Sequence, residues 1–380
     1  MQAACLLQPG VEISLRIVQL GKDALGKVLA RSIYVPDGRV LLRAGVTLSS
    51  TYVAHLLQRG YASVYIQDEL VPGLEVVDAV SETTRVRATA LMVAALDAAC
   101  NSRALDHARV SRVVDDILAD LHKEAGFVFE LTSLRSADEY SFVHSVNVSV
   151  LSVILGQSIF MGYRDLKQLG MGALLHDLGK IKVPAELLQR KGGLSPEEFE
   201  LVKAHATLGF DIIRSHPEFS TMAAHVALQH HERLDGSGYP RGLRHGEILA
   251  FGLITGIADV YDALVSNRPY RPGFHPSEAI QQLVQGAGTL FDENLVRKLM
   301  ETMAVYPVGS ILWLSDNTVA VAVRQQRSLP AHPVVAVIAD PTHALITPCE
   351  FGLDARPDLY VIAALPDYPD RVKEQLVANG

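Results

Sequence analysis

The sequence predicts a mainly α-helical protein in which a helical HD-type bundle is flanked by two small β-rich units. Apolar residues recur three and four positions apart over about residues 81–305, which is the period of helices. Short β-type runs separated by turn residues occupy both ends of the chain. At 380 residues, the chain is also longer than one usual domain. We therefore expect three units, over residues 1–72, 81–305 and 306–380.

The N-terminal unit is expected to contain a β-hairpin. Two β-type runs flank residues 36–38, whose Pro-Asp-Gly sequence favours a turn. A short segment compatible with a helix follows over residues 49–59, and another strand over residues 62–66. The stretch that contains Pro72 and Gly73 is predicted to be a linker.

One helix of the central unit and two strands of the C-terminal unit are read directly from local patterns. Ser195, Pro196 and Glu198 form a capping box with proline at the first helical position, so His205 falls on this helix. Two β-rich runs separated by turn residues, 311–323 and 333–340, predict the strands.

Composition and charge exclude several classes of protein. With 34 basic and 42 acidic residues and no Lys/Arg stripe, we expect no polymeric nucleic acid as a partner, although a small anionic ligand remains compatible. The most apolar helical runs, 88–100 and 148–162, are shorter than the roughly 18 to 20 residues of a membrane span, and no secretory signal is expected. The three cysteines lie far apart, which is typical of free thiols in a reducing compartment. We expect a cytoplasmic protein.

The densest chemistry begins with His176 and Asp177, at the end of an apolar helical run and before Gly179. An imidazole next to a carboxylate can serve two neighbouring metal ions, because the carboxylate has two oxygens and can bridge. Taken alone, such a doublet is a weak signal.

A second cluster begins with His230 and His231 and extends through a loop to Pro240. Adjacent helical residues point roughly 100° apart, so one apolar face cannot bury both imidazoles. A helix end, however, can direct both toward one ion. This arrangement favours metal ligands over core residues.

Three further residues, His144, His205 and Asp259, complete a candidate ligand set. Each could by itself be a packed or solvated side chain. Jointly, five histidines and two aspartates in one helical unit supply the six or more nitrogen and oxygen ligands that a two-metal site needs.

These residues resemble the HD-GYP family of the HD phosphohydrolase superfamily. Residues 176–180 match the HDxGK motif, and residues 230–240 match HHExxDGxGYP in full. The segment ADVYDAL at 258–264, followed by RPYR at 268–271, resembles the downstream part of the family. The resemblance extends over about residues 133–303.

The resemblance implies hydrolysis of cyclic di-GMP to linear pGpG, or onward to GMP, at two divalent metal ions. It implies one ion bound by His144, His176, Asp177 and Asp259, and a second bound by Asp177, His205, His230 and His231. Two such cations lower the pKa of a shared water and neutralise charge on the phosphoryl oxygens. The donor set accepts Fe, Mn, Zn, Co or Ni, and the resemblance favours iron or manganese.

The resemblance also implies contacts to the substrate. Lys180 would place a charge near the scissile phosphate, and Arg268 and Arg271 would hold the other phosphate. Gly238 and Tyr239 would shape the guanine pocket. The alternative roles are a helix C-terminal cation for Lys180, ordinary surface charge for the arginines, and loop packing for Tyr239.

Two positions refine this expectation. Some relatives carry a Glu four residues before His144 and bind a third metal ion there, but this chain has Tyr140, which cannot replace a carboxylate at neutral pH. A two-metal centre is therefore expected. Asp262, one helical turn after Asp259, is expected to face the site without a metal of its own or to contact the substrate.

Three functions remain open at this stage. The first is a phosphodiesterase for cyclic di-GMP, and the second is a sensor or interaction protein that binds this dinucleotide with little turnover. The third is an enzyme for another cyclic dinucleotide or for a nucleotide monoester, although the GYP loop and Arg268 weigh against a monoester. The terminal β-rich units suggest regulation, with a homodimer or a signalling protein as partner.

Overall fold

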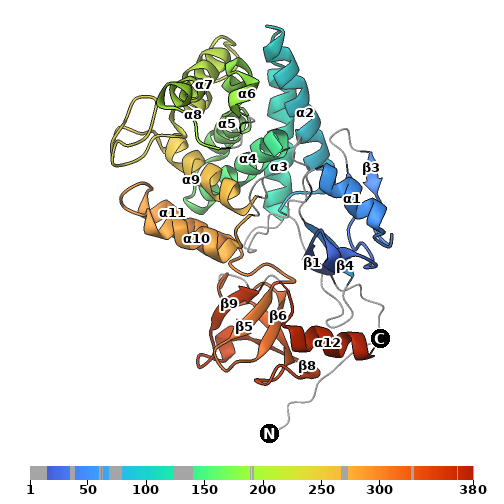
Figure 1. Ribbon diagram of the computed structural model, residues 1–380. Coiled ribbons are helices and arrows are strands. Elements are labelled where there is room, and N and C mark those ends of the chain that lie inside the picture. Colours follow the sequence, from blue (N-terminus) through green and yellow to red (C-terminus); the bar gives the residue numbers. More distant parts are fainter. Residues whose placement is uncertain are drawn as a thin grey trace.

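The computed structural model describes residues 15–34, 39–59, 61, 63–67, 79–123, 140–188, 190, 192–266, 273–326, 329–365 and 367–379. A body of helices lies above a β-rich C-terminal unit, with the N-terminal unit at one side (Figure 1). This arrangement confirms the predicted mainly α fold with β-rich ends. The domain boundaries proposed from the sequence stay predictions.

The helical body is built around α4, whose residues 144–156 are all buried and which is therefore central. It packs against α5, which ends just before His176, against α9, which carries Asp259, and against α2 and α11. Among the described residues, no helix combines the length and apolarity that crossing a bilayer requires. The helices are α2 (Glu82–Cys100), α3 (His107–Lys123), α4 (Tyr140–Ser158), α5 (Tyr163–Leu174), the 3-10 helix η2 (Leu178–Lys182), α6 (Ala185–Leu188), α7 (Pro196–Arg214), α8 (Thr221–Gln229), α9 (Ala250–Val265), α10 (Pro276–Gln285) and α11 (Glu293–Thr302).

The predicted start of α7 is confirmed. The Ser195 hydroxyl accepts a hydrogen bond from the Glu198 amide, and the Glu198 carboxylate accepts one from the Ser195 amide. Together they satisfy two amides that have no partner within the helix. This cap fixes where α7 begins and hence where His205 lies.

The N-terminal unit pairs short strands around one helix. Its two-stranded sheets are β1 (Leu15–Gln19) with β4 (Ser63–Gln67), and β2 (Ile33–Tyr34) with β3 (Val40–Leu42), both antiparallel; α1 is Ser50–Gln58. The predicted hairpin strands, helix and following strand are thus confirmed. The turn at 36–38 and the linker with Pro72 and Gly73 lie outside the described residues.

The C-terminal unit is a five-stranded antiparallel sheet with the strand order β8-β7-β6-β5-β9. The inner strand β7 is buried along its whole length, because separate apolar clusters cover the two faces of the sheet. The elements are β5 (Ile311–Leu314), β6 (Val319–Arg324), β7 (Val334–Ala339), β8 (Leu345–Gly352), a 3-10 helix η3 (Leu353–Ala355), β9 (Val361–Leu365) and α12 (Asp370–Asn379). The two predicted β-rich runs correspond to β5 with β6, and to β7.

The two terminal units contact each other, although they lie at opposite ends of the sequence. The Arg16 guanidinium on β1 donates a hydrogen bond to Asp367 at 2.6 Å and lies 4.6 Å from the centre of the Tyr368 ring. Lys373 on α12 pairs with the same carboxylate at 2.7 Å. Tyr65 of β4 is buried in the apolar cluster that contains Ile311 of β5. The terminal units therefore share one interface beside the helical body.

Replacing Asp367 tests this interface. In an Asp367→Ala variant the nearly buried Arg16 loses a carboxylate partner, so we expect the free energy of unfolding to fall by about 1 to 3 kcal/mol. Urea unfolding followed by circular dichroism measures the change. Asp358→Ala removes only an exposed ion pair with Arg356, so it should change the free energy of unfolding much less than Asp367→Ala does. Equal effects of the two substitutions would contradict the interface.

Candidate metal centre

The candidate ligands come from helices that are separate in sequence and meet in the middle of the bundle. Three helices, α4, α7 and α9, each supply one ligand from within the helix. The remaining ligands lie where helices end: after α5 and after α8. The residues are His144 on α4, His176 and Asp177 between α5 and η2, His205 on α7, His230 and His231 after α8, and Asp259 on α9.

The side chains form two groups, each with ligand atoms that all lie within 4.8 Å of one another. One group is His144, His176 and Asp259, and the other is Asp177, His205, His230 and His231. The sequence analysis divided the residues in the same way, except that Asp177 was assigned to both ions.

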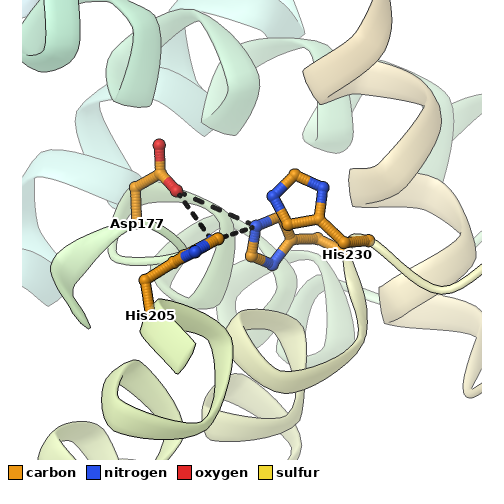
Figure 2. Close-up of side chains that lie close together, drawn as sticks. Asp177, His205 and His230 are labelled. Atoms are coloured by element: carbon orange, nitrogen blue, oxygen red, sulfur yellow. Dashed lines mark hydrogen bonds and ion pairs between the residues drawn. The ribbon is translucent and has the colours of Figure 1, made fainter. Parts of the chain in front are cut away.

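Asp177 lies between the two groups. Its Oδ2 is 3.8 Å from His144 Nε2 and 3.4 Å from His176 Nε2. Its Oδ1 is 3.5 Å from His205 Nε2 and 3.8 Å from His230 Nε2, as Figure 2 shows. Each carboxylate oxygen therefore faces a different group of imidazoles. These distances are longer than those of ordinary hydrogen bonds. The carboxylate oxygens and the imidazole nitrogens therefore surround common points and do not bond closely to one another.

Hydrogen bonds at Nδ1 orient four of the imidazoles. Three of these rings donate from Nδ1 to a carbonyl three or four residues earlier in the chain, which leaves Nε2 facing the cluster. The pairs are His176 with Ala173 at 2.7 Å, His205 with Val202 at 2.6 Å, and His230 with Val226 at 3.1 Å. The backbone itself thus fixes these rings.

The fourth imidazole, that of His144, is oriented by Asp262. His144 donates from Nδ1 to the Asp262 carboxylate at 2.7 Å, and the Asn147 amide donates to the same carboxylate at 2.7 Å. The Asp262 side chain has 0% exposure, so it offers no surface to a ligand. In this structure Asp262 lies behind His144 and holds the ring in place, and the alternative of a substrate contact stays a prediction.

Two buried polar atoms support a fit to metal ions. Within the described part of the chain, His176 Nε2 and Asp177 Oδ1 are buried and have no hydrogen-bond partner. Such atoms are costly to bury unless something else satisfies them. Imidazole nitrogen and carboxylate oxygen are suitable donors for divalent transition metals, so the residues present fit such ions.

The electrostatics of the site keep most of the candidate ligands in the form that binds a cation. Burial opposes ionisation of Asp177, but Lys180 and the neighbouring histidines hold its pKa well below its usual value. Burial lowers the pKa of His205, holds that of His230 well below its usual value, and lowers that of His231 to about 3. These imidazoles are therefore neutral, as ligands must be.

His144 differs from the other imidazoles. Burial opposes its protonation, but hydrogen bonds and charges from Asp259 and Asp262 outweigh burial and raise its pKa to about 9. The buried carboxylates of Asp259 and Asp262 beside this ring therefore favour the binding of a cation in the group that contains His144.

Gly179 of the HDxGK motif allows η2 to approach α7 closely. A Cβ at this position would lie 2.0 Å from the His205 carbonyl oxygen and 2.5 Å from the Gly209 amide nitrogen. Any side chain would therefore push Asp177 away from His205. Glycine at this position is therefore needed to keep Asp177 close to His205.

The GYP loop is held against the ligands by Glu232. This buried carboxylate accepts hydrogen bonds from the amides of Arg241 and Leu243, both at 2.8 Å. A Cβ on Gly238 would lie 2.5 Å from the His231 carbonyl oxygen, so the loop can fold over the ligands only with glycine there. The role of Glu232 could not be predicted from sequence, because it depends on residues nine and eleven positions later.

Tyr239 and Lys180 lie directly beside the ligands. The Tyr239 ring stacks on the His231 ring, with centres 4.6 Å apart and planes at 30°. Lys180 forms an ion pair with Asp177, and its side chain is 35% exposed. Arg268 and Arg271 lie outside the described residues, as does the side chain of Tyr140. Their predicted roles, including the absence of a third metal ion, stay predictions.

A Gly179→Ala substitution tests the close approach. We expect it to lower the affinity for the bound metal by about 10-fold or more, because Asp177 and His205 are forced apart. Metal content by elemental analysis, after dialysis against graded chelator, measures this. Gly162→Ala is the matched control, since a Cβ there meets nothing within 4 Å. Unchanged affinity in Gly179→Ala would contradict the geometry.

Asp262→Ala tests the support of His144. Without the carboxylate, the His144 ring loses its orientation, and metal affinity should fall by about 10- to 100-fold. Asp262→Asn keeps a hydrogen-bond acceptor, so its affinity for the metal should lie between those of wild type and Asp262→Ala. Calorimetric titration with Mn²⁺ measures the affinities, and circular dichroism confirms folding. An alanine variant that is folded and binds Mn²⁺ like wild type would exclude this role.

Known proteins match the part of the chain that carries this site. Residues 130–295 match a family model described as an HD domain. A cyclic di-GMP phosphodiesterase of Pseudomonas aeruginosa is 34% identical over 244 residues, 64% of this chain and 59% of that protein. A cyclic di-GMP phosphodiesterase of Thermotoga maritima is 39% identical over 181 residues, 46% of this chain and 49% of that protein. A 3'3'-cGAMP-specific phosphodiesterase of Vibrio cholerae is 33% identical over 168 residues, 44% of this chain and 36% of that protein.

The match thus spans about half the length of the two cyclic di-GMP phosphodiesterases and 36% of the length of the 3'3'-cGAMP-specific phosphodiesterase. The matched segment contains both sequence motifs and the two groups of ligands. Residues 130–295 of this chain match an HD domain, and the similarity to proteins named as cyclic di-GMP phosphodiesterases supports the predicted resemblance to the HD-GYP family.

Proposed function

We propose that this chain is a metal-dependent phosphodiesterase that hydrolyses cyclic di-GMP to linear pGpG, or onward to GMP. The observation that carries the proposal is Asp177, whose two oxygens face two separate groups of buried ligands. The relatives named as cyclic di-GMP phosphodiesterases support the choice of substrate. The reaction adds water to one phosphorus and breaks its bond to the ribose 3′ oxygen.

We place two divalent metal ions, iron or manganese, in the two groups, with Asp177 as the shared ligand. When bound, such ions supply Lewis acidity to the phosphoryl oxygens and lower the pKa of an attacking water. The imidazole nitrogens and carboxylate oxygens of the site suit both metals. His144, His176 and Asp259 would hold one ion, and His205, His230 and His231 the other.

Lys180 would stabilise the charge that develops on the substrate. Its partly exposed ammonium lies beside Asp177, so it can place a positive charge between the ligands and solvent. A fixed cation at a point where negative charge grows stabilises the transition state more than the ground state. This supports the catalytic role predicted from the HDxGK motif.

Tyr239 would form one wall of the base pocket. Burial and the nearby Asp177 and Asp259 carboxylates raise the pKa of its phenol above the usual range, so the ring stays neutral. A neutral ring fixed on His231 offers a flat surface and a hydroxyl. Arg268 and Arg271 are proposed to hold the second phosphate, and Gly238 to keep the loop close to the metal ligands.

The proposal is tested by purifying the protein without oxygen, loading it with Fe²⁺ or Mn²⁺, and following cyclic di-GMP by chromatography. Wild type should yield pGpG or GMP, whereas Asp177→Ala should lose activity by about 100-fold or more because the shared ligand is gone. Binding without cleavage by the loaded wild type would favour a sensor. Cleavage of 3'3'-cGAMP in preference to cyclic di-GMP would reassign the substrate, as the Vibrio relative suggests.

Lys180→Met separates catalysis from metal binding. It keeps most of the aliphatic side chain but removes the charge, so we expect kcat to fall by about 100- to 1,000-fold while metal content stays constant. Lys182→Met, in the same 3-10 helix but exposed, should retain wild-type kcat. If kcat is unchanged in Lys180→Met, the lysine has only the helix-end role.

A further inference from the structure

Two side chains on α7 lie beside the candidate site and have no role in the chemistry described above. They are Phe199 and Lys203, four residues apart and therefore on one face of the helix. The same helix carries the ligand His205. Phe199 is 43% exposed, so part of its ring is accessible to a ligand.

Phe199 extends a row of rings that starts at a metal ligand. The Tyr239 ring stacks on His231, and the Phe199 ring meets the Tyr239 ring edge to face, with centres 6.1 Å apart and planes at 79°. The Tyr239 ring is also 6.2 Å from the His205 ring. The row therefore leads from the ligands to an exposed aromatic surface.

Lys203 places its charge between these rings. Its Nζ lies 4.8 Å from the centre of the Phe199 ring and 5.7 Å from that of the Tyr239 ring. Its ion-pair partner, Glu200 at 2.6 Å, has a side chain that is 68% exposed. The Lys203 side chain is 26% exposed, but ion pairs with an exposed partner are weak, so an anionic ligand can displace the carboxylate.

The combination suits a nucleotide. An exposed ring can stack on a purine base, and base–aromatic stacking contributes substantially to nucleic-acid binding. A lysine ammonium beside the ring can pair with a phosphate. The chain has a formal net charge of −8, so an anionic substrate depends on such local positive groups.

We propose that Phe199 and Lys203 form a substrate subsite, in which Phe199 stacks on one purine base of the dinucleotide and Lys203 pairs with an adjoining phosphate. The inference rests on the proposed function and deepens it, because it assigns contacts that the HD-GYP motifs do not include. A purely structural role would instead have Phe199 support the Tyr239 ring. If Phe199 only supports Tyr239, its removal should displace the GYP loop and lower kcat. If Phe199 is part of a subsite, its removal should raise KM.

The experiment is steady-state hydrolysis of cyclic di-GMP by the metal-loaded full chain. Phe199→Ala should raise KM by about 10-fold with kcat within about twofold of wild type. Phe199→Tyr keeps an aromatic face and should restore KM, whereas Phe199→Leu keeps apolar bulk and should not. Leu201→Ala is the matched control, since Leu201 is 53% exposed on the same helix. Lys203→Gln should raise KM and weaken its dependence on salt.

The outcomes separate this inference from the proposed function. Cleavage by wild type together with an unchanged KM in Phe199→Ala would overturn the subsite and leave the phosphodiesterase in place. A fall in kcat with KM unchanged would assign Phe199 to the support of Tyr239 and also overturn it. If metal-loaded wild type neither binds nor cleaves cyclic di-GMP, both the function and the subsite are excluded.

Discussion

The structure depends on the burial of Asp177 among imidazoles. Its side chain is only 10% exposed, yet nearby positive and polar groups keep its pKa well below the usual value, so it is an ionised carboxylate inside the protein. An ionised group is costly to bury unless it is paired. Its oxygens face two sets of imidazole nitrogens, and Asp259 adds further negative charge. The bundle therefore holds a concentration of electron-pair donors for which divalent cations are the natural partners.

The helices do more than bring these donors together. Carbonyls one turn back in the chain hold His176, His205 and His230 by their Nδ1 atoms, so the backbone that positions each ligand also selects its tautomer. Glycine permits the necessary close contacts, since Gly179 meets the backbone of α7 and Gly238 meets the backbone after α8. A rigid scaffold of this kind suits a reaction in which metal positions must not change.

Much of this could be predicted from sequence because the decisive signals are local. The capping box at Ser195, the helix-end position of His176 and Asp177, and the strands β2 to β7 follow from short patterns, whereas β1, β8 and β9 were not predicted. The HHExxDGxGYP motif identified the family. The role of Asp262 could not be predicted, because an acid one turn from a ligand can point toward the site or behind it, and only the packing of α4 against α9 decides. The contact of Arg16 with Asp367 joins residues 351 positions apart, which no local pattern encodes.

The central claim is that one aspartate joins two metal sites, and anomalous X-ray scattering from crystals of the Mn²⁺- or Fe²⁺-loaded protein tests it most directly. Data collected at the absorption edge of the metal locate each ion without reference to activity. We predict two peaks, one beside His144, His176 and Asp259 and one beside His205, His230 and His231, with Asp177 between them. A single peak, or two peaks that do not share Asp177, would contradict the account.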